Sequence, residues 1–319
     1  MNIEKLIGNT PMIKILVKYQ EKIINVYAKL EYYNYTGSIK DRLAYYIITK
    51  ALESGKLKEG MPIIEATSGN TGISFAALGA YFNHPVHIFM PDWASKERVE
   101  IMKLYGATVH LISKEDGGFL EAIKQADLLA QKLNGFRPNQ FDNFQNIEAH
   151  YLTTGLEIIN QVPQIDAFVS GIGTGGTLMG IGKRIKEVHP QAKIIALEPT
   201  QLPILSNENA TGNHKIEGIG DDFIPTIVDK EKIEKIISID EEDAINMSRI
   251  LARKFGLGVG ISSGANLLAA IQSSNSNEHI VTVFADDFKK YLTTDLSKVI
   301  NTNSTLLSNQ IEILSIQNI

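Results

Sequence analysis

Three short segments carry residues whose chemistry and spacing could build one ligand site. Lys40 lies among small and hydroxyl residues in the run 34–42, NYTGSIKDR. Two glycine-rich loops follow, TSGNTG at residues 67–72 and GTGGT at residues 173–177. A lysine amine can form a Schiff base with an aldehyde, and a glycine turn that opens a helix can bind an anion. An enzyme that holds pyridoxal phosphate and an amino-acid carboxylate needs these features.

Each of these segments also has a simpler interpretation. The loop at residues 171–176 fits the spacing of a dinucleotide fingerprint, and Glu198 stands where a ribose-binding acid would follow. The loop alone therefore leaves a nicotinamide-dependent dehydrogenase open. The loop at 67–72 could be an ordinary capped helix start, because Ser, Thr and Asn are common cap residues. Lys40 beside Asp41 and Arg42 could belong to a solvated helix face.

Composition excludes several classes of function. The chain has 319 residues, a formal net charge of -5 and no cysteine. We therefore expect no nucleic-acid partner, no disulfide and no thiolate metal site. The seven His are scattered without ligand spacing, so no metal is expected. No apolar run approaches the ~20 residues of a membrane span, and the first residues are too polar for a signal peptide, so a cytoplasmic protein is expected.

Short apolar runs alternate with helical patterns along most of the chain. Strands are expected at residues 62–66, 86–90, 109–112, 167–170, 194–197 and 280–284, and helices at 73–78, 95–105, 119–133 and 178–188. This alternation predicts an α/β protein with parallel sheets. We expect a first domain over residues 1–145, a second over 146–300 and a tail at 301–319, with the turn cluster 134–139 near the boundary.

The motifs, taken in order, resemble the cysteine synthase and cystathionine β-synthase family of fold-type II pyridoxal phosphate enzymes. The resemblance runs from about residue 3 to 297 and includes further stretches: IGNTP at 7–11, QFDN at 140–143, EGIG at 217–220, GISSG at 260–264 and YLTTDL at 291–296. It implies two twisted-sheet domains with flanking helices, a cofactor in the cleft between them, and a homodimer. It further implies that residues 12–34 pack with the second domain and that residues 85–133 form a mobile subdomain.

The resemblance also assigns roles to residues. Lys40 would form the Schiff base and later take the α-proton, while Asn70 and Ser263 would lie at the cofactor ring. The cofactor phosphate would be held by Gly173, Thr174, Gly175, Gly176 and Thr177, and the substrate by Thr67, Ser68, Asn70, Thr71 and Gln140. The implied reaction is β-replacement or β-elimination on serine- or cysteine-type L-amino acids through an aminoacrylate, as in the synthesis of cysteine from O-acetylserine and sulfide.

Two places depart from the family pattern. Asp286 aligns where most cysteine synthases have a serine facing the pyridine nitrogen, and a carboxylate there would favour a protonated ring. Asp221 and Asp222 follow Gly220 where small residues are usual, and we expect Asp222 more than Asp221 to act as a general base. These departures suggest an enzyme that converts cysteine and water to serine and sulfide, or that joins serine to a thiol. An ordinary cysteine synthase and a catalytically silent homologue remain alternatives, as does a surface contact for Asp286.

The chain ends in Ile319. Cysteine synthases bind the C-terminal isoleucine of serine acetyltransferase through the loop that corresponds to residues 67–72. The resemblance therefore implies such a peptide as a possible partner. It also suggests a minor alternative, in which the chain's own terminus enters that loop and inhibits the enzyme.

Overall fold

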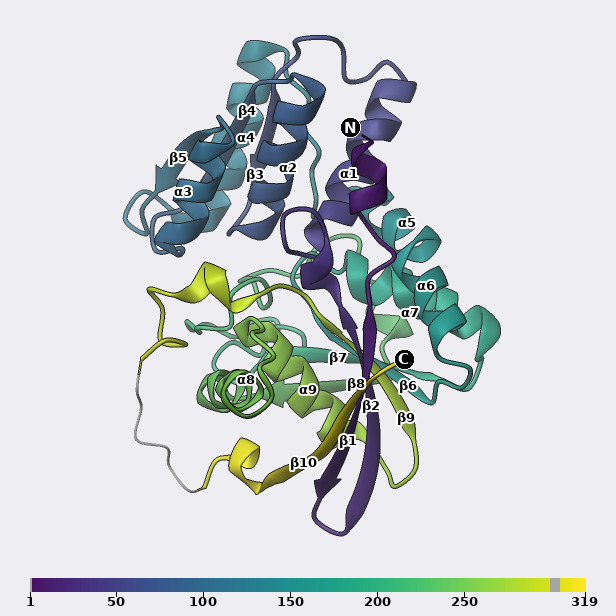
Figure 1. Ribbon diagram of the computed structural model, residues 1–319. Helices are drawn as coiled ribbons and strands as arrows, with labels where there is room; N and C mark the ends of the chain where they lie inside the picture. Colours follow the sequence, from purple (N-terminus) through teal and green to yellow (C-terminus); the bar gives the residue numbers. More distant parts are fainter. Residues whose placement is uncertain (1, 299–304) are drawn as a thin grey trace.

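The computed structural model describes residues 2–298 and 305–319. Residues 1 and 299–304, which include the expected domain end at 300 and the first part of the expected tail, lie outside the description. The chain forms two sheets, one of three strands and one of seven, with helices on their faces (Figure 1). The predicted α/β fold with two sheet domains and flanking helices is confirmed.

The smaller sheet is parallel and has the order β3-β4-β5, with β3 at Ile63–Ala66, β4 at Val86–Pro91 and β5 at Thr108–Ile112. Every residue of β3 is buried, as expected for a strand covered on both faces. Helices α1 (Lys40–Glu53), α2 (Asn70–Phe82) and α3 (Lys96–Leu104) share one core with the sheet, and α4 (Gly118–Leu133) packs on the other face.

The larger sheet has the order β10-β1-β2-β9-β6-β7-β8. Strands β2 (Lys22–Leu30), β9 (His279–Phe284), β6 (Ala167–Gly171), β7 (Lys193–Pro199) and β8 (Lys235–Ile239) run parallel. The edge differs from the expected all-parallel arrangement, because β1 (Met12–Tyr19) pairs antiparallel with both β2 and β10 (Ile311–Asn318). The N-terminal hairpin β1–β2 therefore lies in the same sheet as the second half of the chain (Figure 1).

Helices cover both faces of this sheet. One face packs against α8 (Glu241–Phe255) and α9 (Ile261–Ser273), and the other against α6 (Thr154–Gln161) and α7 (Gly176–Val188). Helix α5 (Gln145–Leu152) packs on α7 and on α1, so it connects the two halves. Short 3-10 turns lie at Ile3–Leu6, Glu31–Tyr33, Lys230–Lys232, Phe288–Tyr291 and Leu307–Gln310.

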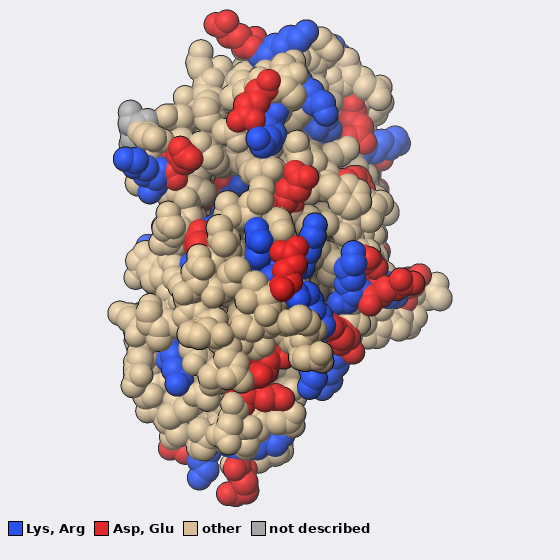
Figure 2. Space-filling view, turned by 90° about the vertical axis from the view of Figure 1, so that its right-hand side faces the viewer, with Lys and Arg blue, Asp and Glu red and all other residues tan. Residues whose placement is uncertain are grey.

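The surface and the chain end bear on possible partners. On the face shown in Figure 2, Lys and Arg are interspersed with Asp and Glu rather than gathered in one field. Within residues 2–298 and 305–319, no helix is both long and apolar enough to cross a membrane, and no three acidic or His side chains converge as a metal site. The N–H of Ile319 donates to the Met12 carbonyl at 3.2 Å, so the chain end lies along the edge of the larger sheet.

Candidate active site

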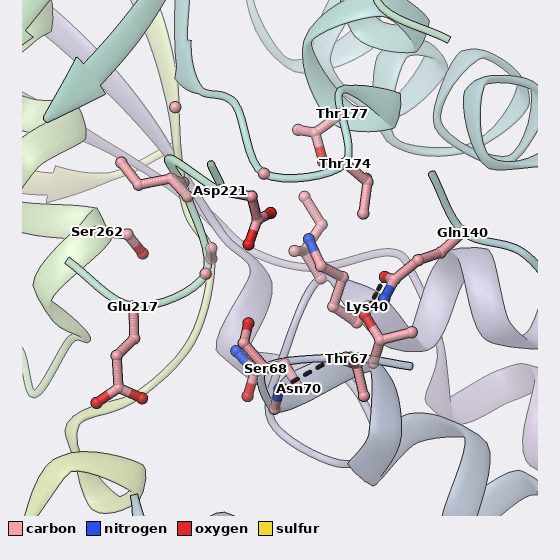
Figure 3. A pocket seen from close by; sticks show the side chains of 18 of the residues that line it. Lys40, Thr67, Ser68, Asn70, Gln140, Thr174, Thr177, Glu217, Asp221 and Ser262 are labelled. Carbon is pink, nitrogen blue, oxygen red and sulfur yellow. Dashed lines mark hydrogen bonds between the residues drawn. The ribbon is translucent and has the colours of Figure 1, made fainter. Parts of the chain in front are cut away.

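A pocket lies between the two sheets, where β3 leads into α2 and β6 leads into α7 (Figure 3). The carboxyl ends of parallel strands are the usual place for ligands in such folds. All three segments that the sequence singled out reach this pocket. The predicted site residues that line it are Lys40, Thr67, Ser68, Asn70, Thr71, Gln140, Gly173, Thr174, Gly175, Thr177 and Asp221.

Lys40 is the first residue of α1, and the start of that helix is tightly held. The carboxylate of buried Asp41 accepts from the Thr36 N–H at 2.6 Å and from the Ser74 hydroxyl at 2.7 Å. Desolvation by burial lowers the pKa of Lys40, although the nearby charges of Asp221 and Asp286 act in the opposite direction. A lowered pKa favours the neutral amine, which is the form that acts as a nucleophile and as a base.

Hydrogen bonds hold the loop at 67–72 in place, and the loop presents backbone donors to the pocket. The Thr67 hydroxyl accepts from the Gly69 N–H at 3.0 Å, and the Thr71 hydroxyl donates to Gln140 Oε1 at 2.6 Å. Gln140 in turn donates to the Ala66 carbonyl at 2.9 Å. Because α2 begins here, its free N–H groups and positive dipole end favour a carboxylate. The arrangement suits the α-carboxylate of an amino acid.

The loop between β6 and α7 forms a cradle without room for side chains. Gly175 has a φ of +88°, in the left-handed region that favours glycine. A Cβ on Gly176 would lie 2.0 Å from Asn146 Oδ1, and the Asn146 amide donates to the Thr174 hydroxyl at 2.9 Å. Backbone N–H groups at the start of α7 are therefore left to bind an anion. This cradle fits the phosphate of pyridoxal phosphate.

Asn70 and Asp286 form one buried group beside the pocket. Asn70 Nδ2 donates to Asp286 Oδ2 at 2.7 Å, and the Tyr291 hydroxyl donates to the same oxygen at 2.8 Å. Asn70 Oδ1 is buried and has no partner among the described residues, so it can accept a hydrogen bond from a ligand. Asp286 itself is fully buried and does not line the pocket. Its Oδ2 orients Asn70, whereas its Oδ1 is buried without a partner among the described residues.

The two serines at the start of α9 have different surroundings, which differ from the expectation that Ser263 lies at the cofactor ring. Ser262 lines the pocket, whereas Ser263 is fully buried and accepts from the Ala285 N–H at 3.1 Å. The two residues are adjacent on a helix and so point in different directions. Ser262 is therefore the hydroxyl that can meet a cofactor ring.

Asp221 lines the pocket, whereas Asp222 is exposed and lines only the outer cavity that leads into it. Figure 3 shows the Asp221 carboxylate directed into the same space as the Lys40 amine. Burial, together with repulsion from Asp222, raises the pKa of Asp221 to about 6, and the Lys40 charge only partly opposes this. The expectation had placed Asp222 ahead of Asp221; the structure puts Asp221 at the reacting space.

Two further charged residues lie in the wall, Arg98 of α3 and Glu217. No sequence motif pointed to Arg98, and Glu217 stood in the EGIG stretch of the resemblance without a predicted role. They form an ion pair with each other across the pocket. Glu198, the acid expected by the dehydrogenase alternative, does not line the pocket. Its carboxylate accepts from the N–H groups of Leu205 and Ser206 at 2.9 and 3.2 Å, which is a structural role in the loop after β7.

Comparison with known proteins shows the family of the chain. Residues 3–286 match the family model described as pyridoxal-phosphate dependent enzyme. The chain belongs to this family. It is 41% identical over 300 residues to a cysteine synthase of Staphylococcus aureus and 43% identical over 297 residues to cysteine synthase B of Campylobacter jejuni. These alignments cover 92% of this chain and 96% and 97% of those proteins.

Solved structures give a similar picture. A hydrogen sulfide-producing enzyme of Fusobacterium nucleatum matches with a TM-score of 0.94 and 47% identity, covering 99% of this chain and 98% of that one. An aspartate-to-asparagine mutant of a hydrogen sulfide-producing enzyme, matching at 0.95, is described in complex with an α-aminoacrylate intermediate. A cysteine synthase of Entamoeba histolytica matches at 0.89 with 37% identity, covering 97% of this chain and 94% of that one. The protein is thus a pyridoxal phosphate-dependent enzyme of the cysteine synthase-like or hydrogen sulfide-producing kind.

Proposed function

We propose that the enzyme releases sulfide from L-cysteine by replacing the thiol with water, so that cysteine and water give serine and hydrogen sulfide. The observation that carries this proposal is the Asp221 carboxylate in the pocket wall, directed into the same space as Lys40 and with a pKa raised to about 6. A carboxylate with that pKa is still largely ionised at neutral pH and is a stronger base than an ordinary aspartate.

The two possible nucleophiles place different demands on the site. Sulfide is already anionic to a large extent near neutral pH and needs no base, and a nearby carboxylate would repel it. Water is a poor nucleophile until a base removes its proton, which is a contribution of about 10²- to 10⁴-fold in rate. An ionised Asp221 therefore favours water and disfavours a small anion.

The remaining residues have compatible roles. We infer that Lys40, the cradle at 173–177 and Ser262 hold the cofactor, which supplies an electron sink for the α-carbon when bound. The loop at 67–72 holds the substrate carboxylate. Lys40 Nζ takes the α-proton, and the Cβ–S bond breaks with its electron pair leaving on sulfur. As the C–O bond forms at Cβ, Asp221 takes a proton from water and Lys40 returns its proton to the α-carbon, which gives serine. The proton on Asp221 then leaves with the departing sulfide as hydrogen sulfide.

Synthesis of cysteine from O-acetylserine and sulfide is the second candidate. It is supported by the two cysteine synthases that are 41% and 43% identical to this chain. In that case the loop at 67–72 would also accept the C-terminal peptide of a serine acetyltransferase. For either reaction we expect a homodimer, as the resemblance implies, and a cytoplasmic location, as the composition suggests.

The two candidates separate in one assay. The holoenzyme is given cysteine alone, or O-acetylserine with sulfide, and serine, cysteine and sulfide are measured. The proposal expects equal amounts of serine and sulfide from cysteine alone, at a kcat/KM above that for cysteine formation. Efficient cysteine formation, with only a trace of sulfide from cysteine alone, would overturn it in favour of the synthase.

A further inference from the structure

We infer that Arg98 is a positioning residue that connects the substrate-binding loop to the loop that carries Asp221. This inference rests on the proposed role of Asp221 in activating water. It concerns how Asp221 is brought to its place, which the proposed function leaves open.

Arg98 projects from α3 of the smaller-sheet half into contacts with the larger-sheet half. It is 1% exposed, although much of α3 faces solvent. Its Nη1 is paired with the Glu217 carboxylate, and its Nη2 lies 3.7 Å from Asp286 Oδ2. The guanidinium carbon lies 4.5 Å from the centre of the Tyr291 ring. Among the hydrogen bonds and ion pairs described for the guanidinium, only that to Ser95 Oγ, at 2.9 Å, stays within its own half.

The stem of Arg98 lies against the substrate loop. A Cβ on Gly69 would come within 2.2 Å of Arg98 Cδ and 2.4 Å of Nε, so the Arg98 side chain can lie this close to the loop backbone only because residue 69 is glycine. Arg98 Nε is buried and has no partner among the described residues. A carboxylate seated on this loop would therefore meet an arginine already in contact with the loop, and would favour one position of that side chain.

The head of Arg98 holds the other loop. Its partner Glu217 lies only four residues before Asp221, and both side chains line the pocket. Between them, Gly218 and Gly220 have φ of +90° and +70°, conformations that favour glycine. The far end of the loop is fixed to its own half, because the Gly220 N–H donates to the Ile172 carbonyl at 2.8 Å. The Arg98–Glu217 pair thus ties the part of this loop before Asp221 to the smaller-sheet half. After Asp221, the contact to that half is apolar, because Phe223 stacks on Phe119 of α4.

A second tie across the same cleft provides a matched control. Glu97, the neighbour of Arg98 on α3, accepts from the Thr293 N–H at 2.6 Å and from its hydroxyl at 2.8 Å. This contact also joins α3 to the larger-sheet half, but it ends at the segment after Tyr291 and not at the Asp221 loop. Loss of the Glu97 carboxylate should therefore weaken the contact between the two halves without displacing Asp221 specifically.

The test compares two nucleophiles acting on the same bound substrate. The holoenzyme is given cysteine with isotopically labelled sulfide, and two rates are measured: formation of serine, which needs activated water, and exchange of label into cysteine, which needs no base. Arg98→Gln and Glu217→Gln should each lower serine formation at least about tenfold more than exchange, since displacing a catalytic group by about 1 Å costs about 10²-fold. Arg98→Lys should restore part of the loss.

The controls separate the possible failures. Glu97→Gln should change the two rates by the same factor. If Arg98→Gln also lowers serine formation and label exchange by the same factor, Arg98 only holds the two halves together, and the inference is wrong. Asp221→Asn should lower serine formation without lowering exchange; if it does not, the proposed function itself fails. Glu217→Gln approaches the same contact from the other side, so the inference remains testable even if an Arg98 variant fails to fold.

Discussion

Asp221→Asn is the substitution that examines the proposed chemistry most closely. Asparagine has nearly the same shape as aspartate but cannot accept a proton as a base. Because general-base assistance contributes about 10²- to 10⁴-fold, we expect kcat for sulfide release from cysteine to fall by at least about 10²-fold. The KM should change little, since Asp221 lies opposite the loop that is proposed to bind the carboxylate.

The pH profile gives a second, independent signature. With a pKa of about 6, only about one tenth of Asp221 is ionised at pH 5 but about nine tenths at pH 7. Wild-type sulfide release should therefore rise with pH through about 6, and this rise should disappear in Asp221→Asn. Initial rates between pH 5 and 9, measured by sulfide detection, test both points. A variant that keeps its rate within about threefold, or keeps the rise near pH 6, would refute the reasoning.

Four other predictions follow from the contacts. Asp221→Asn should raise the free energy of unfolding at pH 7.5 by at most about 3 kcal/mol, because a carboxyl pKa raised from 3.8 to about 6 disfavours folding as pH rises through that window. In urea unfolding the gain should vanish near pH 4, and an equal gain at both pH values would contradict the prediction. Gly176→Ala should weaken cofactor binding at least about tenfold in fluorescence titrations, since the new methyl group would collide with Asn146; unchanged affinity would show that the cradle can yield. Arg42→Met should lower the free energy of unfolding by about 3–5 kcal/mol, because two carboxylates pair with this buried guanidinium, and a loss under about 1 kcal/mol in urea unfolding would argue against it. Deleting Ile319 should leave the KM for cysteine unchanged, because the chain end lies along the larger sheet; a lower KM would revive inhibition by the terminus.

The sequence predicted the site best where the functional residues lie close together in the chain. The loops at 67–72 and 173–177 follow buried strands and open helices, and Lys40 begins α1, so each local pattern carries its own geometry. The pattern could not decide between neighbours. Ser262 and Ser263 occupy adjacent helical positions, and Asp221 and Asp222 adjacent loop positions, and only tertiary packing determines which side chain faces the pocket.

Long-range contacts were hidden for a different reason. The hairpin at residues 12–30 interleaves Lys with apolar residues, and only the family resemblance placed it with the second domain. Its position is set by pairing with β9 some 250 residues later and with β10. Arg98 lies in the sequence KERVE, which is typical of a solvated helix face. Its partner Glu217 lies 119 residues further along the chain. No local pattern could reveal that this charge is buried at the pocket.

The account depends on Lys40 being the residue that carries the cofactor. Borohydride reduction of the purified holoenzyme, followed by proteolysis and mass spectrometry, tests this directly. We predict a single phosphopyridoxyl label on the peptide that contains Lys40, and loss of the visible absorbance of the bound cofactor in Lys40→Ala. A label on any other lysine, or a protein that takes up no pyridoxal phosphate, would contradict the account.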